Sequence, residues 1–141
     1  MRGLLLVLLI SVPLSSAFLF RTKQRVIVKG RLFCGDEPAS NVLLKLVDED
    51  TGPDPDDEMK RGRTDAEGRF ELDGTEYEMS SIDPWLKIYH DCNDGLPCQR
   101  KWKWKIPDKY INSGDDRSKV MDLGEWNLEL IPDEEERDCI H

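Results

Sequence analysis

Apolar and polar residues alternate with a period of two in most apolar stretches of this 141-residue chain. In the first such stretch, Val26, Val28 and Leu32 are separated by polar positions such as Lys29 and Arg31. Successive side chains of a β-strand point to opposite faces of the sheet, so this pattern is typical of strands with one buried face. No stretch carries an apolar stripe at helical spacing over three turns. The sequence therefore predicts an all-β fold.

Turn residues separate the alternating segments. The predicted strands cover residues 26–33, 42–47, 69–73, 85–90, 99–106 and 120–131, with a weaker edge strand over 58–64. Gly68 can close a hairpin, because glycine adopts positive φ without a steric penalty. Residues 48–57 are predicted to form a loop, since Pro53 and Pro55 lack the N–H that a strand needs. We expect an antiparallel two-sheet β-sandwich of about seven to eight strands.

Two shorter features complete the predicted fold. Residues 76–81 are compatible with one helical turn, so the sandwich holds at most a short helix. Pro132 is expected to end the last strand, because proline interrupts a hydrogen-bonded ladder. The charged tail over 133–138 is then held only by Cys139.

The first seventeen residues have the features of a secretory signal peptide. Arg2 provides a positive start, an apolar run follows from Leu4 to Val12, and the small residues Ser15 and Ala17 suit cleavage after Ala17. The run is too short to cross a bilayer, which needs about 20 residues. The sequence therefore predicts a secreted, extracellular protein with no transmembrane segment. Its parts are a signal peptide over 1–17, an N-terminal extension over 18–24 and one domain over 25–141.

Four cysteines follow the predicted signal peptide: Cys34, Cys92, Cys98 and Cys139. An even number of cysteines in a small secreted chain predicts two disulfide bonds, with three possible connectivities. A zinc site is disfavoured, because the spacing of Cys92 and Cys98 is unlike that of zinc fingers. We expect Cys92–Cys98 to close the intervening loop and Cys34 to pair with Cys139.

The segment from Arg100 to Lys105 is the main candidate for a binding site. In a strand, Lys101, Lys103 and Lys105 share one face, while Trp102 and Trp104 occupy the other. A row of ammonium groups can meet an anionic lipid, polysaccharide or receptor surface. The alternative is that these lysines only protect an exposed strand edge from aggregation. Arg100, Lys101, Lys103 and Lys105 are therefore the predicted binding residues.

Other charged groups are weaker candidates. The acidic stretch from Asp48 to Glu58 does not match the calcium-binding EF-hand pattern, which favours a solvated loop. His90 lies beside carboxylates, but no nucleophile elbow accompanies it. The formal charge of −9 disfavours nucleic acid as a partner, since phosphate neutralisation is the main source of that affinity. We expect no metal site, no cofactor and no catalytic residue.

Several motifs resemble the secreted transthyretin-like family of nematodes. They are 28–34 (VKGRLFC), 38–42 (PASNV), 54–57 (DPDD), 64–70 (TDAEGRF), 82–93 (IDPWLKIYHDCN), 107–110 (PDKY) and 137–141 (RDCIH). The resemblance covers nearly all of residues 25–141 and implies a prealbumin-like sandwich in an extracellular protein. Among transthyretin relatives, 5-hydroxyisourate hydrolase carries a terminal Tyr-Arg-Gly-Ser motif. This chain ends in Arg-Asp-Cys-Ile-His, so the resemblance does not imply that activity.

These observations together predict a binding protein rather than an enzyme. The main hypothesis is a bridging or signalling module that contacts an extracellular receptor or an anionic cell-surface ligand. The alternative is a carrier of a small hydrophobic ligand in a channel between subunits, as in transthyretin itself. A hydrolase is the third and least favoured class. The sequence leaves the oligomeric state open.

Overall fold

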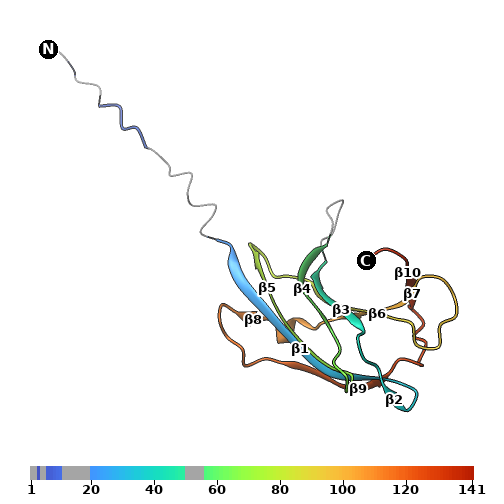
Figure 1. The fold of residues 1–141 in the computed structure, drawn as a ribbon. Helices are drawn as coiled ribbons and strands as arrows, with labels where there is room; N and C mark the ends of the chain where they lie inside the picture. Colours follow the sequence, from blue (N-terminus) through green and yellow to red (C-terminus); the bar gives the residue numbers. More distant parts are fainter. Residues whose placement is uncertain (1–2, 4–5, 11–19, 50–55) are drawn as a thin grey trace.

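The computed structural model describes residues 3, 6–10, 20–49 and 56–141, and these form a two-sheet sandwich beyond residue 20 (Figure 1). The strands in the described ranges are β1 (Thr22–Cys34), β2 (Glu37–Pro38), β3 (Leu43–Asp48), β4 (Asp57–Arg63), β5 (Arg69–Glu78), β6 (Pro84–His90), β7 (Gln99–Lys105), β8 (Asn112–Ser113), β9 (Met121–Asn127) and β10 (Glu136–Asp138). One 3₁₀ turn, η2 (Asp108–Tyr110), lies between β7 and β8. The predicted all-β sandwich is confirmed.

The first sheet is built around the long strand β1. Strand β5 pairs with β1 in antiparallel fashion from Thr22↔Glu78 to Arg31↔Arg69. Strands β8 and β9 pair with the other side of β1, and β2 pairs with the end of β1 at Phe33 and Cys34. Strand β9 runs parallel to β1, which is the one parallel pair among the described strands.

The second sheet has the order β10-β7-β6-β3-β4, and all its pairs are antiparallel. Strand β4 confirms the predicted edge strand. Strand β10 adds to β7 by pairing Arg137 with Arg100. The C-terminal tail is therefore held by strand pairing as well as by Cys139, which corrects the expectation of a tail held only at its cysteine.

The core lies between the two sheets, where the alternating apolar residues meet. Its fully buried members include Val26, Val28, Leu32, Leu44, Leu46, Leu86, Ile88, Trp102, Ile106 and Leu128. In β7, Trp102 is 1% exposed while its neighbour Lys101 lies on the other face. The alternation predicted for this segment is thus confirmed. Burial of this apolar surface is the main force that stabilises the sandwich.

Several predicted boundaries differ from the structure. The helical turn expected over 76–81 is wrong, because β5 continues to Glu78, which pairs with Thr22, and residues 79–81 are not helical. The last long strand ends at Asn127 rather than at residue 131. Strand β1 begins at Thr22, so it includes part of the predicted N-terminal extension. Asp48 ends β3 and Asp57 begins β4, so the two ends of the loop expected over 48–57 belong to strands instead.

The predicted signal-peptide cleavage after Ala17 lies outside the described residues, as do the positions 50–55 of the acidic stretch. No helix among the residues that the structure describes is long and apolar enough to span a membrane.

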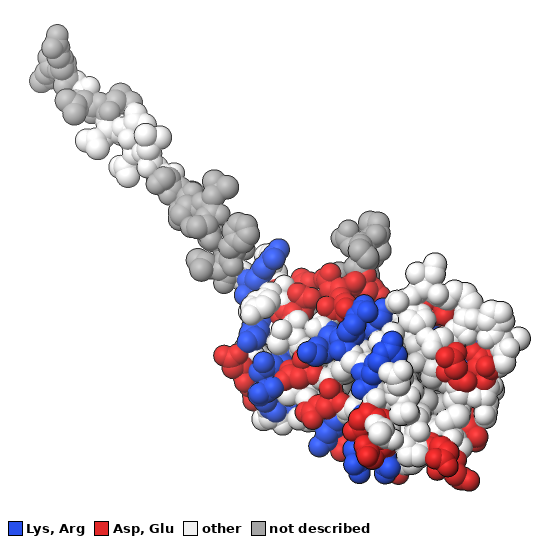
Figure 2. All heavy atoms as spheres, viewed as in Figure 1, with Lys and Arg blue, Asp and Glu red and all other residues white. Residues whose placement is uncertain are grey.

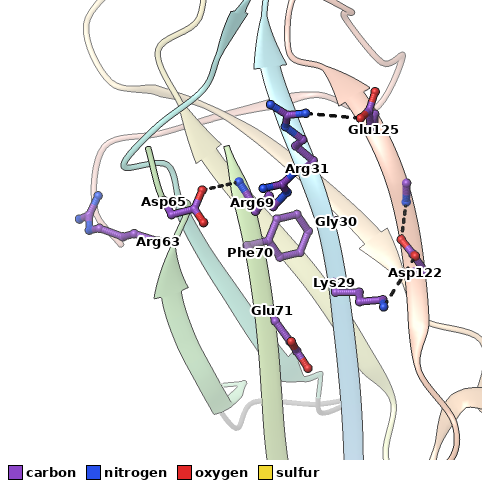
Figure 3. A pocket seen from close by; sticks show the side chains of 11 residues that line it. Lys29, Gly30, Arg31, Arg63, Asp65, Arg69, Phe70, Glu71, Asp122 and Glu125 are labelled. Carbon is purple, nitrogen blue, oxygen red and sulfur yellow. Dashed lines mark hydrogen bonds and ion pairs between the residues drawn. The ribbon is translucent and has the colours of Figure 1, made fainter. Parts of the chain in front are cut away.

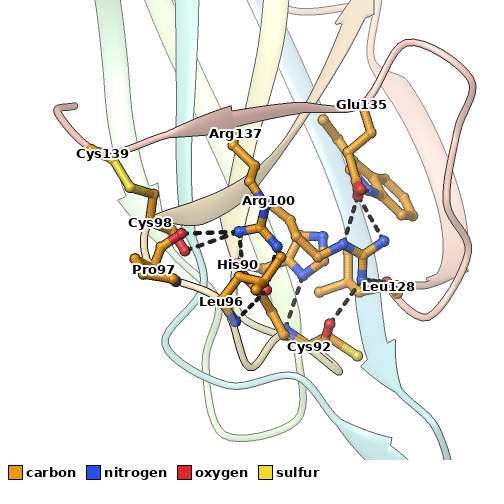
Figure 4. Close-up of polar contacts among 12 residues, drawn as sticks. His90, Cys92, Leu96, Pro97, Cys98, Arg100, Leu128, Glu135, Arg137 and Cys139 are labelled. Carbon is orange, nitrogen blue, oxygen red and sulfur yellow. Dashed lines mark hydrogen bonds and ion pairs between the residues drawn. A yellow bond between two sulfur atoms is a disulfide. The ribbon is translucent and has the colours of Figure 1, made fainter.

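All four cysteines form disulfide bonds, but the predicted connectivity is wrong. The bonds are Cys34–Cys92 and Cys98–Cys139. Cys92 is 8% exposed and packs in the core, where the end of β1 brings Cys34 from the opposite sheet. Cys98 precedes β7, and β10 places Cys139 beside it (Figure 4). Spacing along the chain favoured the short loop, whereas strand packing decides which sulfur atoms meet.

Candidate functional site

The predicted lysines lie on the outer face of the second sheet, and each is paired with a carboxylate. Lys101 lies 3.5 Å from Glu136 and 3.6 Å from Asp138. Lys105 lies 3.5 Å from Asp83. The three ammonium groups do share one face, but the positive row is largely neutralised by its neighbours.

Lys103 is also paired with a carboxylate. Its ammonium group pairs with Glu49 and lies 4.2 Å from the centre of the Trp85 ring. The register places Lys103 opposite Lys87 and Lys87 opposite Lys45. Lys87 pairs with Asp56 at 3.0 Å, so this neighbour is also neutralised. Basic and acidic side chains also alternate over the side of the molecule seen in Figure 2, without a continuous basic surface there.

Arg100, the fourth predicted binding residue, is buried and lies on the opposite face from the lysines. Its guanidinium group donates to the carbonyl oxygens of Cys92, Leu128 and Leu130, each at 2.8 Å, and pairs with Glu135 at 2.6 Å (Figure 4). The residue is 5% exposed. Its position gives it a structural role in joining β7 to the C-terminal segment, away from any surface ligand.

A surface hollow lies on the outer face of the first sheet (Figure 3). It is a groove of about 620 Å³ lined by Lys29, Gly30, Arg31, Arg63, Asp65, Arg69, Phe70, Glu71, Asp122, Gly124 and Glu125. Most of these residues belong to β1, β5 and β9. Its size falls within the range typical of ligand pockets. We call this feature the β1/β5/β9 groove.

An irregularity in the pairing of β1 with β9 shapes the groove. The register shifts between Lys29 and Arg31, next to Gly124, which has a φ of 71°. A Cβ on Gly30 would lie 3.0 Å from the Phe70 ring and 3.1 Å from the carbonyl oxygen of Gly124. The two glycines therefore allow the strands to approach closely at the floor of the groove.

One end of the groove is basic. Arg31 on β1 lies directly opposite Arg69 on β5, and Arg63 lies beyond Arg69 (Figure 3). Like charges in directly opposed positions of antiparallel strands are destabilising. The backbone N–H of Arg69 donates to Asp65, but no ion pair to its guanidinium group is present in the described part of the chain.

Arg31 is oriented by three contacts. Its Nε donates to the carbonyl oxygen of Glu67 at 2.7 Å, and its guanidinium carbon lies 4.6 Å from the centre of the Phe33 ring. Glu125 approaches its Nη1 at 3.7 Å, a long ion pair at the surface. Arg31 is thus positioned by neighbours that leave its charge only weakly compensated.

The other end of the groove has mixed charge. Lys29 lies opposite Glu71 across the strands and 4.0 Å from Asp122. Asp65 lines the groove near Arg69, and one of its carboxylate oxygens accepts the backbone N–H groups of Glu67 and Arg69. That carboxylate orders the turn before β5. The groove therefore offers guanidinium groups at one end and a balanced set of charges at the other.

His90 is built into the core rather than into a reactive site. It is 2% exposed, its Nδ1 accepts the backbone N–H of Cys92 at 3.1 Å, and its ring stands edge-on to Trp102. Burial and the nearby Arg100 charge lower the pKa of His90 to about 4. The imidazole is therefore neutral near neutral pH, and no nucleophile accompanies it among its hydrogen-bond partners.

The buried His90 predicts that the protein loses stability as the solution is acidified. A histidine whose pKa is lowered by folding takes up its proton preferentially in the unfolded chain. The loss begins below the ordinary pKa of 6.5 and levels off near 4. It amounts to at most about 3 kcal/mol of unfolding free energy.

Urea unfolding at a series of pH values would measure this effect, with the variant His90→Gln as the non-titrating comparison. The difference in unfolding free energy between the wild type and His90→Gln should decrease as the pH falls from 6.5 to about 4. Asp48, whose pKa is raised by burial, is present in both proteins and cancels. An identical pH dependence in the two proteins would show that His90 is not buried in the neutral form.

Two carboxylates from the ends of the acidic stretch and one from β5 come together at one corner of the sandwich. Ligand oxygens of Asp48, Asp57 and Glu76 lie within 4.8 Å of one another. Asp48 is 3% exposed and accepts the backbone N–H of Asp83 at 2.8 Å. This hydrogen bond gives Asp48 a role in holding β3 to the segment before β6. The predicted absence of a metal site stays a prediction.

Comparison with known proteins identifies the family. Residues 29–107 match the model described as TTR-52, transthyretin-like family. Transthyretin-like protein 5 of Caenorhabditis elegans is 47% identical over 137 residues, which cover 96% of this chain and 99% of that protein. Transthyretin-like protein 33 of the same organism is 47% identical over 115 residues, covering 81% of this chain and 80% of that protein. The chain belongs to the transthyretin-like family, as its motifs indicated.

The β1/β5/β9 groove was not found from the sequence, although several of its residues lie within two of the segments that carry the resemblance. Lys29 and Arg31 occur in the first strand motif, and Arg69 follows the hairpin turn at Gly68. The sequence feature that could have indicated the groove is that Arg31 and Arg69 stand on the polar faces of two strands of the same sheet. Only the register shows that they are directly opposed.

Proposed function

We propose that this chain is a secreted, extracellular binding protein, with no enzymatic activity, that recognises an anionic group at the basic end of the β1/β5/β9 groove. The observation that carries this proposal is the direct opposition of Arg31 and Arg69, with the Arg69 guanidinium group free of ion pairs in the described chain. An oxyanion between the two guanidinium groups would relieve their repulsion. The planar guanidinium fork also matches sulfate, phosphate and carboxylate geometry.

The lysines of β7 are less well suited to this role. Lys101, Lys103 and Lys105 already have carboxylate partners, so an anionic ligand must compete with them. Surface ion pairs contribute little each, so the competition is not prohibitive. Binding through these lysines, as the sequence suggested, stays a second candidate that the same experiment can separate from the first.

A carrier of a hydrophobic ligand is less well supported by the groove. Its walls carry lysine, arginine, aspartate and glutamate side chains, with Phe70 as the one aromatic lining residue. Pockets for apolar ligands are lined mainly by hydrophobic and aromatic side chains. The charged lining favours a ligand that carries charge, such as a group on a cell-surface molecule or receptor.

The proposal predicts that neutralising the opposed arginines weakens binding of an anionic probe. The probe is a fluorescently labelled heparin oligosaccharide, and the measurement is fluorescence polarisation at increasing salt. The double variant Arg31→Gln/Arg69→Gln should weaken binding by at least roughly tenfold, because a charge-assisted hydrogen bond contributes about 1.5–3 kcal/mol. Wild-type binding should weaken as salt increases, because salt screens exposed charges.

Two comparison variants locate the site. Arg61→Gln removes an exposed arginine from the other sheet and should leave binding unchanged. Lys101→Gln/Lys103→Gln/Lys105→Gln should reduce binding much less than the arginine double variant. If the lysine variant abolishes binding and the arginine variant retains it, the site is the β7 face and the groove proposal is wrong. Absence of binding even at low salt would refute recognition of a sulfated ligand by either face.

A further inference from the structure

A second pocket lies where the C-terminal segment passes over β7. Its volume is about 310 Å³, and it is lined by Trp102, Lys103, Trp104, Pro132, Asp133, Glu134 and Glu135. This volume is at the lower end of the range for small-ligand sites. Its lining shares no residue with the β1/β5/β9 groove. We call it the Trp104 pocket.

Tryptophan side chains form one wall of this pocket. Trp104 is partly exposed, and its ring centre lies 6.0 Å from that of Trp102 and 4.8 Å from that of Trp126. The edge-to-face contact with Trp126 supports the Trp104 ring from a different strand, β9. The face of an indole attracts cations more strongly than the other aromatic side chains do. The wall therefore suits a positively charged group with an apolar body.

The charges around the pocket are mainly negative, which complements a positively charged ligand. Glu135 is already paired with Arg100 and accepts the indole N–H of Trp102 at 3.0 Å. Lys103 contributes to the lining, but its ammonium group pairs with Glu49 and lies over Trp85. Asp133 and Glu134 are exposed and form no ion pair within the described part of the chain. The uncompensated charge at the rim is thus negative.

The rim is also held in place before any ligand binds. Glu135 is fixed by the buried Arg100, and the next residues, Glu136–Asp138, pair with β7 as strand β10. The Cys98–Cys139 bond closes the far end of this segment. A prearranged site avoids part of the entropy cost of ordering the protein on binding. The segment therefore presents Asp133 and Glu134 beside the tryptophan wall as a formed site.

We propose that the Trp104 pocket binds a small organic cation of the quaternary ammonium class, with its positive charge on the face of Trp104 and beside the carboxylates of Asp133 and Glu134. This site is independent of the anionic group proposed for the β1/β5/β9 groove. The chain then has two recognition sites of opposite sign on different parts of the sandwich.

Titration of intrinsic tryptophan fluorescence with choline tests this site. The control ligand is 3,3-dimethylbutan-1-ol, which has nearly the shape of choline but no charge. Choline should give a saturable change in emission, and the neutral alcohol should bind at least roughly tenfold more weakly, as the loss of a desolvated cation–π contact predicts. Equal effects of choline and the alcohol would refute the proposal, since the charge would then play no part.

Three variants test the assigned residues. Trp104→Leu keeps an apolar side chain but removes the aromatic face, and Asp133→Asn/Glu134→Gln removes the rim charges; both should weaken choline binding by roughly tenfold. Glu129→Gln, an exposed acid outside the pocket lining, is the control and should bind like wild type. Because Trp104→Leu also removes a fluorophore, its affinity is measured by calorimetry and its fold by the melting temperature. Wild-type affinity in both folded pocket variants would overturn the assignment.

Discussion

Replacing Arg100 by methionine is expected to destabilise the protein by about 3–5 kcal/mol, because it breaks a buried ion pair and leaves several acceptors without a donor. The change removes the partner of Glu135, whose side chain is 16% exposed. It also removes the donors to the carbonyl oxygens of Cys92, Leu128 and Leu130. Methionine preserves much of the side-chain volume, so the loss reports the polar contacts rather than a cavity.

Urea unfolding followed by tryptophan fluorescence measures this loss. Arg61→Met is the matched control, because Arg61 pairs with Glu58 at the surface with 56% of its side chain exposed. Such a pair contributes about 0–1 kcal/mol, so the control should be nearly as stable as wild type. A similar small effect for Arg100→Met would show that the C-terminal segment is not anchored through this residue.

Removal of the Cys34–Cys92 bond is expected to have a comparable effect. The bond closes a loop with a sequence separation of 58, and a loop of this length corresponds to about 4 kcal/mol of stabilisation through the entropy of the unfolded chain. The double variant Cys34→Ser/Cys92→Ser also places a hydroxyl group in the core beside the apolar cluster that contains Cys92. The free energy of unfolding should fall by at least about that amount.

Two measurements distinguish the Cys34–Cys92 bond from the other possible pairings of the four cysteines. Peptide mapping of the unreduced protein should recover Cys34 linked to Cys92 and Cys98 linked to Cys139. The variant Cys98→Ser/Cys139→Ser provides the comparison: it should free the C-terminal segment to proteolysis while the core keeps its near-ultraviolet signal. Recovery of a Cys92–Cys98 peptide would contradict the connectivity in the structure.

The alternation of residues was sufficient to predict the class of fold and the two faces of β7. Trp102 lies in the core and Lys103 lies outside because neighbouring positions of any strand face opposite sides. The same rule could not predict what Lys103 meets on its face. Its partners Glu49 and Trp85 come from segments far away in the chain, and only the order of strands in the sheet brings them together.

Other features depend on packing between distant segments. The parallel pairing of β9 with β1 and the buried pair of Arg100 with Glu135 both follow from the path of the chain after β7. Arg100 looked like part of a basic surface because it stands next to Lys101 in the sequence. The adjacent position is on the opposite face, and there the approach of the C-terminal segment buries it.

The β1/β5/β9 groove also depends on contacts between segments that are distant in the chain, so the sequence predicts it only in part. Arg31 and Arg69 each stand at a polar position of a predictable strand, so their exposure follows from the sequence. Their direct opposition follows from the register of β1 and β5, which a shift of one residue would remove. The groove floor further depends on the close approach at Gly30, where Phe70 fills the space that a side chain would occupy.

Nuclear magnetic resonance of the arginine Nε–Hε groups during titration with inorganic sulfate tests most directly whether Arg31 and Arg69 bind an anion. We expect saturable shifts of the Arg31 and Arg69 signals at low ionic strength, with one common affinity. The signal of Arg61, on the other sheet, should change little because that side chain already pairs with Glu58. Shifts of equal size at all exposed arginines, or none at Arg31 and Arg69, would contradict an anion site in the β1/β5/β9 groove.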